Sequence, residues 1–167
     1  MDAGPGIFYR DAAGYESKGN GDPEPSSRRN REVYLIKKEW DVQEKVLHCI
    51  NTLLEKKAKD IIVINIKELS SFTDYFIICS GTSDRQVKAL ASFIQESLKK
   101  TGIHSLGVEG ERYGKWVLID YDDVVVHIFQ EPVRTFYDLE RLWPEAPRMA
   151  IGNDATEVTS LDQSLSC

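Results

Sequence analysis

Two short runs of apolar residues constrain the fold more than any other feature of this sequence. Residues 61–66 (IIVINI) and 75–79 (YFIIC) are apolar almost throughout, and the first run is rich in β-branched side chains. Runs of this length without polar alternation indicate strands that are covered on both faces. The chain is therefore predicted to contain a central sheet with helices on both sides.

Two amphipathic helices are predicted next to these strands. The first begins after Asp41, which forms a capping pattern with Glu44, and its apolar face repeats at helical spacing through Val42, Val46, Ile50, Leu53 and Leu54. It is expected to end among the lysines of residues 56–59. The second covers residues 84–100, with Ser83 as its N-cap and Gly102 just beyond its end.

Further strands are predicted in the second half of the chain. Residues 116–119 and 124–129 flank the acidic turn 120–123 and are typical of a hairpin, while residues 106–108 suggest a short extra strand. Residues 136–143 indicate a short helix closed by prolines. The predicted fold is α/β, with a mixed, roughly five-stranded sheet flanked by helices.

The folded part is expected to be one domain between two polar segments. Residues 1–40 are rich in Gly, Pro, Ser and mixed charge, so they are predicted to form a flexible N-terminal arm. Residues 41–147 carry the helical and strand patterns of the α/β domain. Residues 148–167 are polar and without periodicity, which predicts a flexible C-terminal tail.

Charge and cysteine content narrow the function classes. The chain has 27 acidic and 21 basic residues, a net charge of -6, which argues against a protein that binds nucleic acid mainly through phosphates. The three cysteines fit neither a disulfide framework nor a zinc site, which favours a reducing compartment. Because no secretion signal or membrane-spanning run is evident, we expect a cytoplasmic protein without membrane contact.

Sequence motifs for a catalytic, phosphate-binding or metal-binding site are weak. The turn 80–83 (SGTS) between a strand and a helix is a place where phosphate can bind, but the P-loop lysine and the paired carboxylates of a nucleotidyltransferase are missing. Asp120, Asp122 and Asp123 lie in a single turn, which favours a solvated hairpin tip over a metal site. His127 is interpreted as a hydrogen-bonded histidine beside the core, although a nucleophilic pair with Cys79 is conceivable. We expect no catalytic residue, metal or cofactor.

Trp116 is the most informative single residue. It begins a predicted strand beside Tyr113 and Lys115, and residues 109–123 contain five acidic side chains against two basic ones. An aromatic anchor surrounded by one sign of charge is typical of a protein-binding patch. The sequence equally allows Trp116 to pack in the core.

Three blocks of sequence, in order, resemble the ribosomal silencing factor family, also called RsfS or Iojap. They are residues 73–87 (TDYFIICSGTSDRQV), residues 116–129 (WVLIDYDDVVVHIF) and residues 134–143 (RTFYDLERLW). The resemblance covers about residues 41–143 and leaves both ends of the chain outside. One departure is Asp122, which stands where relatives often carry Gly.

The resemblance implies a nucleotidyltransferase-like topology without catalytic carboxylates, and a protein that is not an enzyme. Family members bind ribosomal protein L-fourteen on the large ribosomal subunit, block its association with the small subunit, and repress translation when nutrients are scarce. Ribosomal RNA would be a neighbour only, and a homodimer is possible in the free state. The family's contact surface includes the tryptophan matching Trp116, and by proximity we extend it to Tyr113, Lys115, Asp120, Tyr121 and Asp122.

Two other functions stay open on the sequence alone. One is a nucleotide-binding enzyme of nucleotidyltransferase-like fold that uses the turn at residues 80–83. The other is a protein-interaction adaptor outside the ribosome.

Overall fold

The computed structural model describes residues 7–11, 33–37, 39–162 and 165, and the chain divides into two units, residues 1–39 and 40–167. In the first unit, β1 (Ile7–Asp11) pairs antiparallel with β2 (Val33–Lys37). Most of the predicted N-terminal arm lies outside the described residues. The second unit contains the sheet and helices on which the functional argument depends.

The second unit begins with α1 (Val42–Glu55), and its start is set by local sequence. The carboxylate of Asp41 accepts a hydrogen bond from the Glu44 amide at 2.8 Å, and the Glu44 carboxylate accepts one from the Asp41 amide at 3.1 Å. This is the predicted capping box, which satisfies two amides that have no partner within the helix. The last residue of the helix is Glu55, one position before the lysines among which its end was predicted.

The described residues of this unit form a mixed six-stranded sheet in the order β5-β6-β7-β4-β3-β8. Its strands are β3 (Lys59–Asn65), β4 (Tyr75–Gly81), β5 (Gly107–Glu109), β6 (Trp116–Asp120), β7 (Val124–Gln130) and β8 (Arg148–Ala150). β4 and β7 run parallel, whereas the other neighbours are antiparallel. The predicted mixed α/β fold is confirmed, with one more strand than expected.

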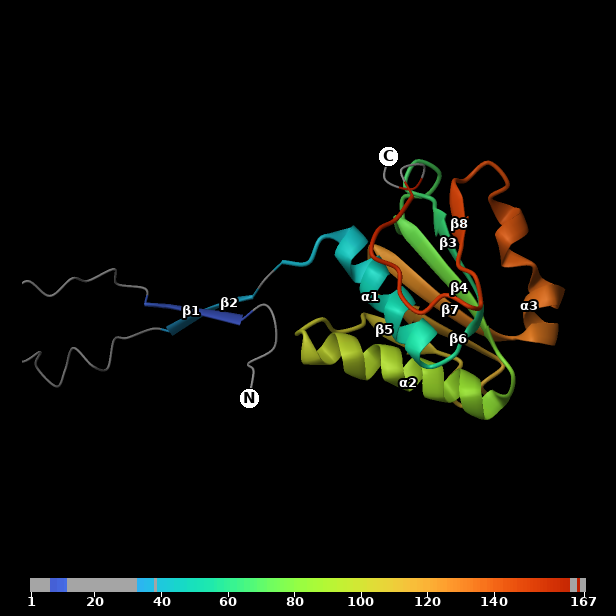
Figure 1. Ribbon diagram of the computed structural model, residues 1–167, viewed down its shortest axis with the longest axis horizontal. Helices are drawn as coiled ribbons and strands as arrows, with labels where there is room; N and C mark the ends of the chain where they lie inside the picture. Colours follow the sequence, from blue (N-terminus) through green and yellow to red (C-terminus); the bar gives the residue numbers. More distant parts are fainter. Residues whose placement is uncertain (1–6, 12–32, 38, 163–164, 166–167) are drawn as a thin grey trace, which may run out of the picture. The chain divides into compact units, whose positions relative to one another are not determined.

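Figure 1 shows how the helices are distributed over the two faces of the sheet. One face is covered by α1 and by α2 (Asp84–Lys100), whose bounds match the prediction and whose N-cap is Ser83. The opposite face is covered in part by α3 (Glu131–Tyr137) and the 3-10 helix η2 (Leu139–Leu142). The sheet therefore has a fully covered face and a partly covered one.

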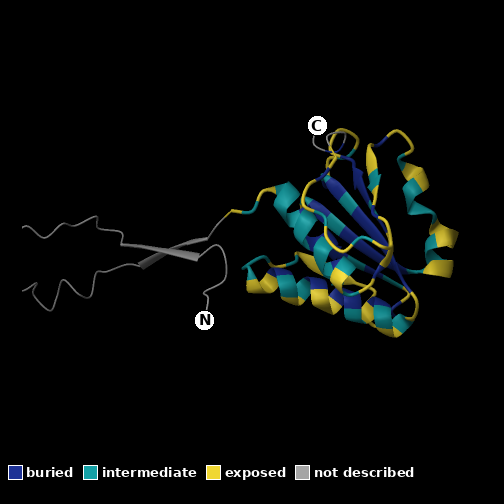
Figure 2. Ribbon diagram, in the orientation of Figure 1, coloured by how far each residue is buried: buried dark blue, intermediate teal, exposed yellow. Residues whose placement is uncertain are grey.

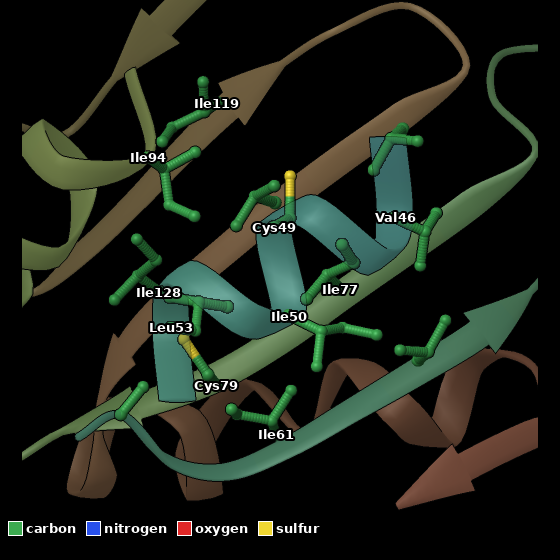
Figure 3. Packing of buried hydrophobic residues seen from close by; sticks show 14 of the residues in the cluster. Val46, Cys49, Ile50, Leu53, Ile61, Ile77, Cys79, Ile94, Ile119 and Ile128 are labelled. Carbon is green, nitrogen blue, oxygen red and sulfur yellow. The ribbon is translucent and has the colours of Figure 1, made fainter. Parts of the chain in front are cut away.

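The main core lies between the sheet and α1 with α2. Figure 3 shows Cys49, Ile50 and Leu53 of α1 pointing onto Ile77 of β4 and Ile128 of β7. All five are fully buried. A smaller second cluster, Ile64, Ile66, Ile78, Phe129 and Ala146, lies on the opposite face. This two-sided burial explains the apolar runs of β3 and β4, since successive strand residues point to opposite faces.

The predicted helix over residues 136–143 is instead two short helices. Pro132 is compatible with the first turn of a helix, so α3 begins at Glu131. Asp138 then adopts a left-handed conformation with φ 45°, which ends α3 before η2 starts. Arg134 of α3 pairs with Glu140 of η2 at 2.8 Å and donates a hydrogen bond to the Ser80 hydroxyl of β4 at 2.8 Å. It thus links the two short helices to the sheet.

The prediction of a flexible tail from residue 148 is wrong for the described residues up to 162 and for Leu165. Residues 148–150 form β8, which pairs with β3. Beyond it, Ile151, Leu161 and Leu165 are buried in the main core cluster. Figure 2 shows that buried residues are otherwise concentrated in the central strands of the sheet. Isolated apolar residues at irregular spacing give no helix or strand period in the sequence. The sequence of this segment therefore resembles a polar tail, although its apolar residues pack on the domain.

Candidate functional site

Strand β6 places the candidate residue Trp116 on the partly covered face of the sheet. Alternation along the strand puts Trp116, Leu118 and Asp120 on this face, and all three are half-buried. Val117 and Ile119 point the other way and are fully buried under the helices. Trp116 and Asp120 thus share a face, about 13 Å apart along the strand.

Neighbouring strands extend this surface. In the antiparallel ladders, Leu118 lies opposite Glu109 of β5, and Asp120 lies opposite Val125 of β7. Paired residues point to the same side of a sheet. Neither Leu118 nor Val125 packs into the two core clusters. We call the group of Glu109, Trp116, Leu118, Asp120, Val125 and the adjoining Tyr137 the open sheet face.

The indole of Trp116 is held by aromatic neighbours on two sides. It stacks on the buried ring of Phe129 with centroids 4.8 Å apart, and it contacts Tyr137 of α3 at 4.9 Å. Its Nε1–H donates a hydrogen bond to Nδ1 of His127 at 3.1 Å. The sequence left open whether Trp116 belongs to the core or to the surface; it joins the edge of the second core cluster while staying partly exposed.

His127 is a neutral acceptor in this arrangement. Only 3% of it is exposed, and burial lowers its pKa from 6.5 to about 4. Because the indole nitrogen is a donor only, Nδ1 must be unprotonated, and the ring proton is on Nε2. The prediction of a hydrogen-bonded histidine beside the core is confirmed.

Lys115 and Tyr113 lie in the loop that leads into β6. Lys115 Nζ is 3.1 Å from the Asp84 carboxylate and 3.2 Å from Gln130 Oε1, so its charge is paired. Tyr113 is 66% exposed, and the guanidinium of Arg112 lies over its ring. Both side chains are accessible, as a binding role requires.

The acidic turn after β6 contains the remaining predicted contact residues, one of which is exposed and one buried. Asp122 is exposed with φ 73°, a conformation that favours glycine, which explains why Gly suits this position. Asp123 pairs with Lys45 of α1 at 2.6 Å. Tyr121, by contrast, is 3% exposed, and burial raises the pKa of its hydroxyl. Tyr121 is therefore a core residue, and its assignment to the contact surface is wrong.

The arrangement offers no nucleophilic pair. Cys79 lies opposite Ile128 in the β4–β7 ladder, so it points away from His127 toward the main core. Burial raises the pKa of its thiol to about 12, which keeps it protonated. Within the part of the chain that the structure describes, no three His, Cys, Asp or Glu side chains gather as metal ligands.

In the turn between β4 and α2, polar groups are hydrogen-bonded to a side chain of the adjoining helix. A Cβ on Gly81 would lie 2.9 Å from the side chain of Val87. The Gln86 side chain accepts hydrogen bonds from both the amide and the hydroxyl of Thr82, at 2.6 and 2.8 Å. These contacts fit the prediction of a tight turn and a helix cap.

Sequence reasoning missed Leu118, Val125 and Tyr137 as members of the surface. Strand alternation from Trp116 was enough to place Leu118 on the same face. Val125 and Tyr137 carried no such signal, because they come close to Trp116 and Asp120 only through the β6–β7 pairing and the path of α3.

Comparison with known proteins identifies the family. The model of the family described as "Ribosomal silencing factor during starvation" (RsfS) matches residues 39–165. The chain belongs to this family. A ribosomal silencing factor RsfS from Chromobacterium violaceum is 42% identical over 113 residues, 67% of this chain and 93% of the relative. A mouse protein named mitochondrial assembly of ribosomal large subunit protein 1 is 32% identical over 97 residues, 56% of this chain and 42% of the relative.

A solved structure supports the same RsfS fold. The crystal structure of a protein from Chromobacterium violaceum aligns with a TM-score of 0.62 at 41% identity, covering 70% of this chain and 98% of the other. The likeness to nucleotidyltransferases stays a prediction. Among the described helices, none has the length and apolar content needed to span a membrane.

Proposed function

We propose that this RsfS family member represses translation by binding the large ribosomal subunit through its open sheet face. The partner would be ribosomal protein L-fourteen, and the bound domain would sterically prevent the small subunit from joining. The observation that carries the proposal is the half-buried Trp116 on a face that α3 and η2 cover only in part. A large, ordered aromatic side chain beside accessible apolar residues is what a protein contact requires.

Charge supports a basic protein partner. Glu109 and Asp120 flank the apolar centre formed by Leu118 and Val125, and the whole chain carries a net charge of -6. The nearby cation of Lys115 is already paired with Asp84. Ribosomal proteins are commonly basic because they contact RNA phosphates, so an acidic rim favours them over bare RNA.

A steric mechanism needs no chemistry from this chain. The buried thiol of Cys79 and the neutral His127 lie on opposite faces of the sheet, and neither is set up for catalysis. The name of the mouse relative places that protein in large-subunit assembly, which supports the large subunit as the site of action here. We therefore propose a non-enzymatic binding factor.

The test is co-sedimentation with isolated large and small subunits, followed by a subunit-joining assay. The intact protein should bind the large subunit selectively and reduce joining. Trp116→Ala should weaken binding about 30-fold, because loss of a central aromatic anchor costs about 2 kcal/mol. The decrease should appear both in the amount sedimented and in the inhibition of joining.

A matched control is Phe93→Ala. Phe93 is 36% exposed on α2, which covers the opposite face of the sheet, so its loss should leave binding unchanged. If Trp116→Ala and Phe93→Ala bind equally well, the open sheet face is not the docking surface. If the intact protein ignores the large subunit at moderate salt, the proposed function itself is wrong.

A further inference from the structure

His127 accepts a hydrogen bond from the indole of Trp116. The Nε1–H of Trp116 donates to Nδ1 of His127 at 3.1 Å, and the two ring centroids are 5.8 Å apart. His127 lies on β7, directly beside Leu118 in the β6–β7 ladder. A hydrogen bond between neighbouring strands thus determines which way the indole edge points.

The environment of His127 is otherwise unfavourable for a polar side chain. Its ring packs edge-on against Phe76 with centroids 4.7 Å apart, and it lies parallel to Phe129 at 6.2 Å. Its Nε2 is buried and has no hydrogen-bond partner among the described residues. An apolar side chain at this position would avoid that penalty, because a buried donor without a partner destabilises the fold.

The aromatic contacts of Trp116 do not determine which edge of the indole faces His127. The Phe129 ring stacks on the indole at an interplanar angle of 24°, and the Tyr137 ring contacts the indole at an interplanar angle of 46°. Apolar contacts of this kind do not distinguish the nitrogen edge from the carbon edge. The acceptor on His127 does, since only the edge that carries Nε1–H can donate to it.

We propose that His127 is a positioning residue that fixes the Trp116 indole in its docking orientation before the partner arrives. This inference rests on the proposed function and deepens it. An anchor that is already ordered loses less conformational entropy when it binds. An apolar replacement would remove the unpaired nitrogen, but it could not accept the indole hydrogen bond.

Two substitutions separate orientation from packing. His127→Leu removes the acceptor and keeps an apolar side chain of similar size. His127→Asn can place its Oδ1 where Nδ1 stands, because both atoms are bonded to Cγ. We expect large-subunit affinity to fall about three- to tenfold in His127→Leu, and His127→Asn to recover most of that loss.

The indole proton of Trp116 gives a readout that loss of packing alone would not produce. In a proton–nitrogen correlation spectrum of the full chain, the three tryptophans give three indole signals, and Trp116→Phe identifies the one from Trp116. That proton should exchange with solvent faster in His127→Leu than in the wild type, and at an intermediate rate in His127→Asn. The signals of Trp40 and Trp143 should be unchanged.

The outcomes distinguish this inference from the proposed function. If Trp116→Ala weakens binding but His127→Leu binds like the wild type, His127 does not position the anchor. Equal losses in His127→Leu and His127→Asn, with no difference in indole exchange, also overturn the positioning role. If Trp116→Ala itself has no effect, the docking surface is wrong and the inference falls with it.

Discussion

At the scale of single residues, His127 shows how burial couples a functional contact to stability. Burial lowers its pKa from 6.5 to about 4, and its neighbours Trp116, Phe76 and Phe129 supply no opposite charge. Between these two pH values the unfolded chain binds a proton that the folded chain does not. The folded state therefore has its full stability with respect to His127 above pH 6.5, and the free energy of unfolding decreases as the pH falls toward 4.

We predict that His127→Asn abolishes this part of the pH dependence. The difference in unfolding free energy between wild type and variant should shift by about 3 kcal/mol between pH 7 and pH 4, in favour of the variant at low pH. Urea unfolding followed by circular dichroism at several pH values measures it. A difference that stays constant across this range would show that His127 is protonated equally in both states.

At the scale of elements, the C-terminal segment shows what local patterns cannot reveal. The carbonyl of Leu165 accepts hydrogen bonds from Asn65 Nδ2 at 2.8 Å and from the Tyr75 hydroxyl at 2.7 Å, and its side chain is fully buried. In addition, Asn51 of α1 forms two hydrogen bonds of 2.8 Å with the backbone of Val158. The segment is thus part of the folded domain.

We predict that Leu165→Ala lowers the unfolding free energy by about 2–4 kcal/mol, because it removes buried apolar volume next to the core. Urea unfolding is the measurement. The matched control is Leu142→Ala: Leu142 is 63% exposed on η2, so its loss should change stability by less than about 0.5 kcal/mol. Equal stability of the two variants would mean that Leu165 is not buried in solution.

Most helices and strands were predictable because their signals are local. The capping box of Asp41 and Glu44, the N-cap at Ser83 and the hairpin around Asp122 each depend on residues that are close in sequence. Strand β8 was not predictable, because its three residues become a strand only by pairing with β3. The break at Asp138 also escaped prediction, since a single residue in the left-handed region leaves the apolar pattern intact.

At the scale of the whole molecule, charge should govern how the protein finds its partner. The chain carries a net charge of -6, and Glu109 is exposed on the open sheet face. We predict that Glu109→Lys slows association with the large subunit and weakens binding several-fold at low salt. Rapid-mixing measurements at two ionic strengths would show the effect shrinking as salt screens the charges.

The matched control for this prediction is Glu96→Lys. It changes the net charge by the same amount, but Glu96 is exposed on α2, on the opposite side of the sheet. Its effect on association should be smaller. If both substitutions slow association equally, total charge and not the open sheet face steers the encounter.

The sequence by itself determined the two-sided burial of β3 and β4, the two long helices, the hairpin and, through three ordered blocks, the family. These follow from apolar periodicity and capping, which act over a few residues. Only the tertiary structure decided that Tyr121 is buried, that Leu118 and Val125 join Trp116 on one surface, and that residues 148–162 pack on the domain. The physical reason is that exposure depends on which distant segments cover a residue, and α3 and η2 leave part of one sheet face uncovered.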